Sequence, residues 1–194
     1  YPFYQAYELA EMLCSNAKKF GASLSECADK SGKDVSAIDW HIEFGQLKDS
    51  LEEIRRDYQT ENGERLEMRP YLVEAEPEVW KKEEFRRYEN FKKLITNLQA
   101  EEIAYARGKM KELRSALKKG EQSAEIFMKF NKIEDIALEG YQGIYKQIRT
   151  DLAGTGEGLE RKLFIKTADE IKRSTMFDAL EVWDTYIGFE EEKQ

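Results

Sequence analysis

Residues 77–118 read PEVWKKEEFRRYENFKKLITNLQAEEIAYARGKMKELRSALK, and this stretch decides the fold that the sequence predicts. It holds one proline, at its first position, one glycine, and dense Glu, Lys and Arg. A proline suits the first turn of a helix, where no amide hydrogen is needed. Apolar residues recur at three, four or seven positions, which is the spacing of one helix face. The stretch therefore predicts one very long helix, roughly 60 Å in length. The apolar residues in question are Tyr88, Phe91, Ile95, Leu98 and Tyr105.

Apolar residues with helical spacing also occupy most of the remaining sequence. They predict helices at about residues 3–28, 36–62, 122–152 and 159–187. No run of four or more residues alternates well enough to predict a strand. The expected fold class is therefore all-α, an elongated bundle of amphipathic helices with one very long helix at about residues 77–118.

Local signals place the ends of these helices. Ser36 is the expected N-cap of the second helix, with Asp39 in its first turn. Asn62-Gly63 is the expected end of that helix, and Lys118-Lys119-Gly120 the end of the very long one. The segment between residues 60 and 76 is expected to be irregular.

A glycine-rich segment divides the chain. Residues 154–158 read GTGEG and predict a linker between an elongated helical stalk-type domain, residues 1–153, and a C-terminal helix with an acidic tail, residues 159–194. This segment lacks the Gly-Lys-Ser/Thr ending of a phosphate-binding loop and follows no strand, so we interpret it as a connector.

Composition narrows the class of protein. The 194 residues are 36% charged and 12% aromatic, with a net charge of −8. The aromatic share is too high for a disordered chain, and no segment reaches the roughly 18 apolar residues of a membrane-spanning helix. The acidic balance disfavours nucleic-acid binding. We therefore expect no nucleic-acid partner and no direct membrane span.

The two cysteines and the first residue give information on the cellular compartment of the protein. Cys14 and Cys27 on one helix would lie about 20 Å apart, beyond the reach of about 7 Å for a disulfide. Two unpaired thiols indicate a reducing compartment such as the cytosol or the mitochondrial matrix. The chain begins at Tyr1 rather than Met, which a cleaved targeting peptide and a trimmed start explain equally well.

Few residues suit catalysis or metal binding. His41 is the single histidine, which excludes a di-iron bundle with two Glu-x-x-His motifs and disfavours a zinc site. The glutamates of residues 83–112 alternate with Lys and Arg, so they indicate solvated ion pairs. We expect no catalytic residues, no cofactor and no metal.

Two stretches resemble a known family. Lys18-Lys19-Phe20-Gly21-Ala22-Ser23-Leu24, a polar linker, and then Ala37-Ile38-Asp39-Trp40 are similar to subunit d of the mitochondrial F-type ATP synthase. Phe44 stands in place of the family's tyrosine. Leu51, Ile54 and Tyr58 resemble the family's next helix, and Ile133-Glu134-Asp135-Ile136 resembles its Ile-Glu-Asp-Leu segment, although the preceding Pro-Phe-Asp is lacking. The resemblance covers about residues 3–136.

The resemblance implies a structural function. Subunit d belongs to the peripheral stalk, the stator that holds the catalytic head against rotor torque. It packs along subunit b, near the oligomycin-sensitivity-conferring subunit, on the matrix side of the inner membrane. By resemblance, this chain is expected to be a non-catalytic stator subunit with those partners and that location.

Exposed aromatic and aliphatic residues on long helices are the candidate contacts with other subunits. Some of these side chains also suit an internal core, and the sequence does not separate the two roles. The candidates are Trp40, Phe44, Leu47, Tyr58, Tyr88, Phe91, Leu98 and Tyr105.

Two other classes of function stay open. A coiled-coil or membrane-sculpting helical scaffold or adaptor needs a basic face, for which Lys81-Lys82, Arg86-Arg87 and Lys92-Lys93 are candidates. A helical enzyme, or an acidic helical inhibitor that meets a basic toxin, is the third class.

Overall fold

The computed structural model describes residues 3–25, 35–42, 50–99, 106–133 and 163–186. These residues contain seven α-helices, one short 3-10 helix and two small antiparallel sheets of two strands each. The chain is therefore mostly helical, but it is not purely all-α.

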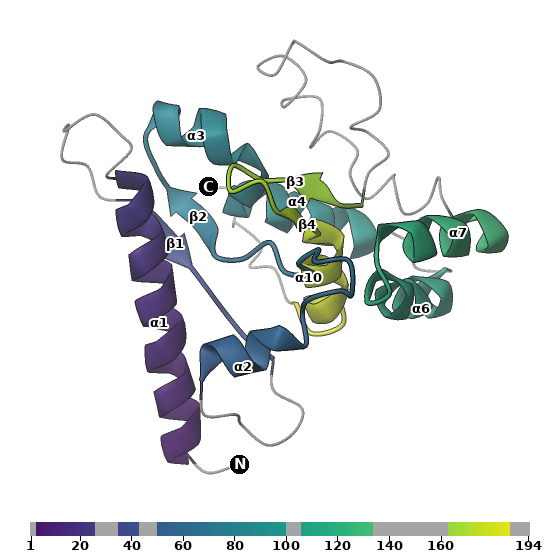
Figure 1. Ribbon diagram of the computed structural model, residues 1–194, viewed down its shortest axis with the longest axis horizontal. Helices are drawn as coiled ribbons and strands as arrows, with labels where there is room; N and C mark the ends of the chain where they lie inside the picture. The colour runs from purple at the N-terminus through teal and green to yellow at the C-terminus, as the bar shows by residue number, and fades with distance from the viewer. Residues whose placement is uncertain (1–2, 26–34, 43–49, 100–105, 134–162, 187–194) are drawn as a thin grey trace, which may run out of the picture.

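The N-terminal elements form one side of the molecule (Figure 1). Helix α1 (Phe3–Ser25) runs along this side and packs on strand β1 (Ser36–Ile38) and on the short helix α2 (Leu51–Arg56). Strand β1 pairs with β2 (Tyr71–Glu74), with Ala37 opposite Leu72. The sheet thus joins α1 to the rest of the fold.

The remaining elements surround the main core. They are α3 (Pro77–Glu83), the 3-10 helix η1 (Glu84–Arg86), α4 (Tyr88–Gln99), α6 (Arg107–Leu117), α7 (Glu121–Asn131), β3 (Ile165–Lys166), β4 (Lys172–Arg173) and α10 (Thr175–Val182). Helix α10 contacts both α4 and α6, and α6 lies against α7.

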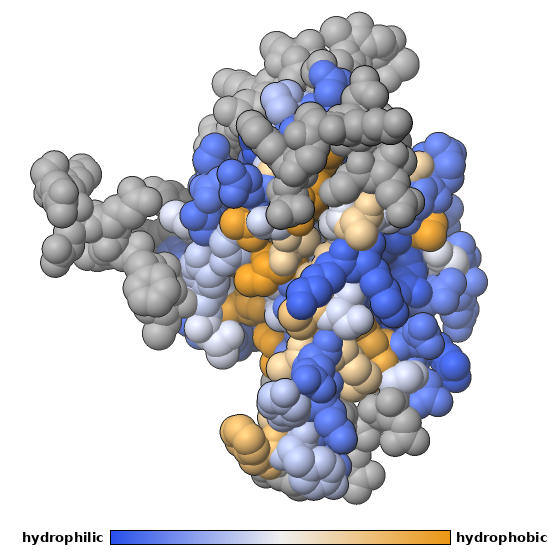
Figure 2. Space-filling view, turned by 90° about the vertical axis from the view of Figure 1, so that its left-hand side faces the viewer, coloured by the Kyte–Doolittle hydropathy of each residue, from blue (hydrophilic) through white to orange (hydrophobic). Residues whose placement is uncertain are grey.

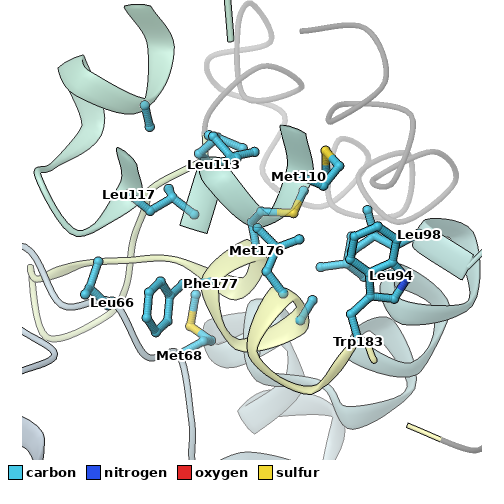
Figure 3. Close-up of a cluster of buried hydrophobic side chains, with 14 of the residues drawn as sticks. Leu66, Met68, Leu94, Leu98, Met110, Leu113, Leu117, Met176, Phe177 and Trp183 are labelled. Carbon is cyan, nitrogen blue, oxygen red and sulfur yellow. The ribbon is translucent and has the colours of Figure 1, made fainter. Parts of the chain in front are cut away.

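The main core is built around α10 (Figure 3). Met176 and Phe177 of α10 are buried against leucines of α4 and α6 and against Leu66 and Met68. Leu163 and Phe164 belong to the same cluster. Residues 163–186 near the C-terminus therefore pack with the central helices in the main core. Burial of these apolar side chains is the main term that stabilises the arrangement.

The expectation of one very long helix over residues 77–118 is wrong. Helix α3 ends at Glu83, Arg87 has an extended backbone with ψ 121°, and α4 begins at Tyr88. The buried Arg86 guanidinium donates to the carbonyls of Met68 and Pro70, so the chain must turn here to bring it inward. Such tertiary contacts outweigh the helix propensity of a charged stretch.

The second expected helix, residues 36–62, is also wrong, as is the expectation of no strand. Ser36 lies in β1 instead of capping a helix, because Ala37 and Ile38 pair with β2. Among the described residues of this range, which lack 43–49, the helix is the short α2, where the Ser50 hydroxyl accepts the amide of Glu53 at 3.2 Å. It ends before the predicted stop at Asn62-Gly63.

Two further predicted helices, over residues 122–152 and 159–187, are interrupted within the described residues, and residues 134–152 of the first lie outside them. Helix α7 ends at Asn131, because Lys132 has a left-handed backbone with φ 53°. The predicted helix over residues 159–187 is replaced in the described part by β3, β4 and the short α10. The predicted linker, residues 154–158, lies outside the described residues.

Several boundaries are confirmed. Helix α1 covers residues 3–25 of the predicted 3–28, α3 begins at Pro77, and α6 ends at Leu117 before Gly120. The glycine there has φ +100°.

Two glycines of this region are expected to respond in opposite ways to alanine. A Cβ at Gly120 would lie 2.8 Å from Glu64 Oε2 on a left-handed backbone, so Gly120→Ala is expected to cost about 1–2 kcal/mol. Gly108 lies inside α6 with nothing within 4 Å, so Gly108→Ala is expected to stabilise by about 0.5 kcal/mol. Urea denaturation measures both, and two changes of the same sign would contradict this assignment.

Candidate functional site

A buried polar cluster is centred on Arg69. This residue precedes Pro70 through a cis peptide bond, in the segment that leads into β2. Its side chain is 1% exposed, and its guanidinium lies between the rings of Trp40 and Tyr58, 5.3 and 5.2 Å from their centroids. A cation held between two aromatic faces is stabilised by their negative π surfaces.

Helix α10 supplies the counter-charges for this arginine. Asp178 and Glu181 are three residues apart and therefore share one helix face. Arg69 Nη2 lies 2.8 Å from Glu181 Oε2, and Arg69 Nε lies 3.6 Å from Asp178 Oδ1. Buried charges persist in proteins when they are paired in this way.

Asp178 also holds the backbone of the opposite segment. Its Oδ2 accepts the amide hydrogens of Met68 at 2.9 Å and of Arg69 at 3.1 Å, and the hydroxyl of Tyr71 at 3.0 Å. One carboxylate therefore satisfies three buried donors and fixes α10 against the chain that enters β2.

The cluster reaches the surface at Tyr58 and His41. The Tyr58 hydroxyl donates to Glu181 Oε1 at 2.6 Å and lies 3.5 Å from His41 Nδ1. The two rings meet edge to face at 6.0 Å. Both residues are half-buried, as is Trp40.

A third carboxylate, that of Asp39, connects the cluster to the N-terminal helices. Asp39 Oδ1 accepts from Arg55 Nη2 at 2.5 Å and from the Trp40 amide at 2.9 Å, and Oδ2 accepts from Asn16 of α1 at 2.7 Å. The Ile38-Asp39-Trp40 stretch thus ties α1, α2 and the Arg69 cluster together.

The protonation states of the cluster follow from burial and pairing. Burial raises the pKa of Asp178 to about 6, although the Arg69 cation acts against this shift. Burial and the Glu181 carboxylate raise the pKa of Tyr58, so its hydroxyl is protonated at neutral pH. Burial alone would lower the pKa of Arg69, but the Asp178 and Glu181 carboxylates outweigh it and raise this pKa, so the guanidinium is permanently charged. At neutral pH the Tyr58 hydroxyl and the Arg69 guanidinium are therefore fixed donors, while Asp178 titrates at mildly acidic pH.

The raised pKa of Asp178 has a consequence for stability. Between about pH 4 and pH 6 the folded chain binds a proton that the unfolded chain does not, so the free energy of unfolding is expected to fall as the pH rises. One such group contributes a slope of at most about 1.4 kcal/mol per pH unit. Burial raises the pKa of Glu83 as well and adds to the same slope.

Urea denaturation at several pH values measures this effect. Asp178→Asn removes the titrating group, and we expect the slope between pH 4 and pH 6 to be smaller in this variant than in the parent chain. An equal slope in both proteins would show that Asp178 has an ordinary pKa.

The candidate contact residues fall into three groups. Trp40, Tyr58 and Tyr88 are half-buried and pack on the main core, while Phe91 and Leu98 are 3% and 0% exposed inside it. The chain's own core therefore holds the latter two side chains. The remaining candidates, Phe44, Leu47 and Tyr105, lie outside the described residues.

An exposed aromatic surface occurs at the start of α1. Phe3, Tyr4 and Tyr7 are 84%, 61% and 56% exposed, while Leu9, Leu13 and Ala17 attach the rest of the helix to the body. We call these three residues the α1 aromatic end. Figure 2, which faces the side of the molecule that carries α1, shows hydrophobic residues reaching the surface among hydrophilic ones. Exposed aromatic clusters of this kind are typical of protein interfaces.

Within the described residues, no group of three or more His, Cys, Asp or Glu side chains is arranged to hold a metal ion. No described helix combines the length and the apolar character needed to cross a membrane. Cys14 is exposed on α1 as a free thiol.

No protein-family model matches the chain, and no curated protein matches its sequence.

The sequence analysis did not find the Arg69 cluster. Its weak signals were an Arg-Pro pair before an apolar run and two acids three residues apart inside an apolar segment, Asp178 and Glu181. A charged residue in an otherwise buried helix face indicates a buried partner, because an unpaired charge is costly there. The sequence does not tell which of its 31 Lys and Arg residues is that partner.

Proposed function

We propose that this chain is a non-catalytic subunit of a larger protein assembly, and specifically a stator subunit of the mitochondrial ATP synthase peripheral stalk. The observation that carries the proposal is the α1 aromatic end. Its three aromatic side chains are more than half exposed at the end of a helix that packs on the body through later turns. Aromatic residues are common anchors where two proteins meet.

The way α1 is attached supports a docking function. Leu9 and Leu13 contact Ile54 of α2, and Asn16 bonds Asp39, so the later turns of the helix are held firmly. These contacts hold the helix in place, so the exposed aromatic residues of its first turns have a defined position on the surface. A partner that covers the α1 aromatic end would bury apolar surface. Such burial stabilises a complex by about 25 cal/mol for each Å² of apolar area removed from water.

The specific assignment is supported by the ordered motifs of residues 18–24 and 37–40 and not by the fold. The long helix predicted over residues 77–118 is broken at residues 84–87, and the Ile38-Asp39-Trp40 stretch forms a strand end and loop instead of a helix start. In this assignment the partners are subunit b and the oligomycin-sensitivity-conferring subunit, on the matrix side of the inner membrane. The chain then has no catalytic residue and no cofactor of its own.

The membrane-sculpting scaffold receives less support. Of its candidate cations, Arg86 is 3% exposed, Arg87 lies 4.5 Å over the Trp80 ring, and Lys92 pairs with Glu89 at 2.7 Å. These three cations are therefore engaged within the chain and do not form the continuous basic face that such a scaffold needs.

The test uses tagged full-length chain purified from gently solubilised mitochondrial membranes. We expect Phe3→Ala/Tyr7→Ala to recover about tenfold less subunit b than the parent chain, as large aromatic anchors often carry 1–2 kcal/mol or more. Phe130→Ala removes an aromatic side chain that is 85% exposed on α7 and serves as the matched control. Equal recovery by all three proteins, or no subunit b with any of them, would refute the proposal.

A further inference from the structure

Helices α6 and α7 form a basic region in an acidic protein. Residues 106–133 contain eight Lys and Arg against three Glu, whereas the whole chain has a net charge of −8. Opposite charges are therefore segregated, and a local basic surface attracts an acidic partner even when the net charge does not.

Four of these cations form a row along α6. Arg107, Lys111, Arg114 and Lys118 follow one another at four, three and four residues and so share one side of the helix. The row is about 16 Å long. Met110, Leu113 and Leu117 face the core from another side of the same helix, which fixes the direction in which the row points.

A carboxylate already occupies the first half of this row. Asp184, just after α10, accepts Arg107 Nε at 2.9 Å on Oδ1 and Lys111 Nζ at 2.5 Å on Oδ2. These two hydrogen bonds, first that from Lys111, lower the pKa of Asp184. Neighbouring cations of the row thus bind one carboxylate through its two oxygens.

The second half of the row holds no carboxylate among the described residues. Lys118 is exposed and Arg114 is half-buried. Neither side chain forms an ion pair with another described residue, unlike Arg107 and Lys111. They stand at the same four-residue spacing as Arg107 and Lys111. The sequence spacing of the pair that binds Asp184 is therefore repeated seven residues further along the chain.

We propose that Arg114 and Lys118 bind an acidic segment of a partner protein, whose carboxylates continue the pairing that Asp184 begins. The carboxylate is favoured over phosphate because the same row already binds one, that of Asp184, in the chain itself. This surface differs in chemistry from the α1 aromatic end, and the proposal does not rest on the stator assignment.

The experiment measures binding of a fluorescent 20-residue poly-L-glutamate to the full chain by anisotropy at 50 mM and 300 mM salt. We expect saturable binding that weakens with salt and is about tenfold weaker in Arg114→Glu/Lys118→Glu. Lys18→Glu/Lys19→Glu reverses two exposed cations on α1 and is the matched control, expected to change affinity less than about twofold. Asp184→Asn frees Arg107 and Lys111 and is expected to tighten binding about threefold.

The same titrations are repeated with a 20-nucleotide single-stranded DNA and with vesicles containing 30% phosphatidylserine. They test whether nucleic acid or an anionic membrane binds this surface in place of an acidic protein segment. Tighter binding of either probe than of poly-L-glutamate would overturn the proposal. Equal loss of poly-L-glutamate affinity in Arg114→Glu/Lys118→Glu and in the control Lys18→Glu/Lys19→Glu would also overturn it. The absence of binding to the parent chain at 50 mM salt would do the same. Circular dichroism melting shows that each variant is folded.

Discussion

Replacement of Arg69 with methionine is expected to lower the free energy of unfolding by about 3–5 kcal/mol. The substitution keeps an unbranched side chain between the rings of Trp40 and Tyr58 but leaves two carboxylates without their cation. Asp178 is 0% exposed, and the Glu181 side chain is 5% exposed, so water does not replace the lost partner. An uncompensated buried charge is among the largest penalties that one substitution causes.

Two further variants show that the effect comes from charge pairing. Arg107→Met removes an arginine that also pairs with a carboxylate, but its side chain is 55% exposed, so a cost below about 1 kcal/mol is expected. Asp178→Asn and Glu181→Gln, added to Arg69→Met, are expected to recover part of the stability because they remove the orphaned charges. Similar losses for Arg69→Met and Arg107→Met in urea denaturation would contradict the buried pairing.

Replacement of Trp40 with alanine is expected to cost about 3 kcal/mol. The indole stacks on Tyr71 with a centroid distance of 5.3 Å and meets Phe91 at 5.0 Å, besides covering the guanidinium of Arg69. Its loss removes aromatic packing and one face of the cation at the same time.

The matched control for this variant is Trp80→Ala. Trp80 is half-buried on α3, with a cation–π contact to Arg87 at 4.5 Å, so its removal is expected to cost about 1 kcal/mol. Thermal and urea denaturation of both variants provide the comparison. A larger loss at Trp80 than at Trp40 would mean that the aromatic stack contributes little to the fold.

The sequence predicts the helices with clear local signals and misses the breaks imposed by distant residues. Pro77 and Gly120 mark helix ends through their own backbone preferences, so α3 begins and α6 ends where expected. The break at residues 84–87 has no such signal. It depends on Arg86 reaching the carbonyls of Met68 and Pro70, which lie 18 and 16 residues earlier in the chain.

The strands were missed for a related reason. Strands β1, β3 and β4 have three, two and two residues, too few for an alternating pattern to stand out. Ser36 also resembles a helix N-cap in sequence, and only the pairing of Ala37 with Leu72 decides for a strand. In α1 the buried hydrophobic side chains are Leu9, Leu13 and Ala17, whereas Phe3 and Tyr7 in its first turns are exposed.

Two residues of the candidate site were singled out from the sequence in another role. Trp40 and Tyr58 were predicted as contacts with other subunits, which stays a prediction, and the structure places both beside Arg69. Arg69 itself was missed, because a single arginine in a chain that is 36% charged carries no distinguishing pattern. Its importance arises from the meeting of three segments that are far apart in sequence.

The most direct test of the central claim, that this chain is a subunit of a larger assembly, is native gel electrophoresis of gently solubilised mitochondrial membranes, with mass spectrometry to locate the chain. Our account predicts that it migrates in the ATP synthase band together with subunit b. Recovery only as a free monomer, or in a band without ATP synthase subunits, would contradict the stator assignment.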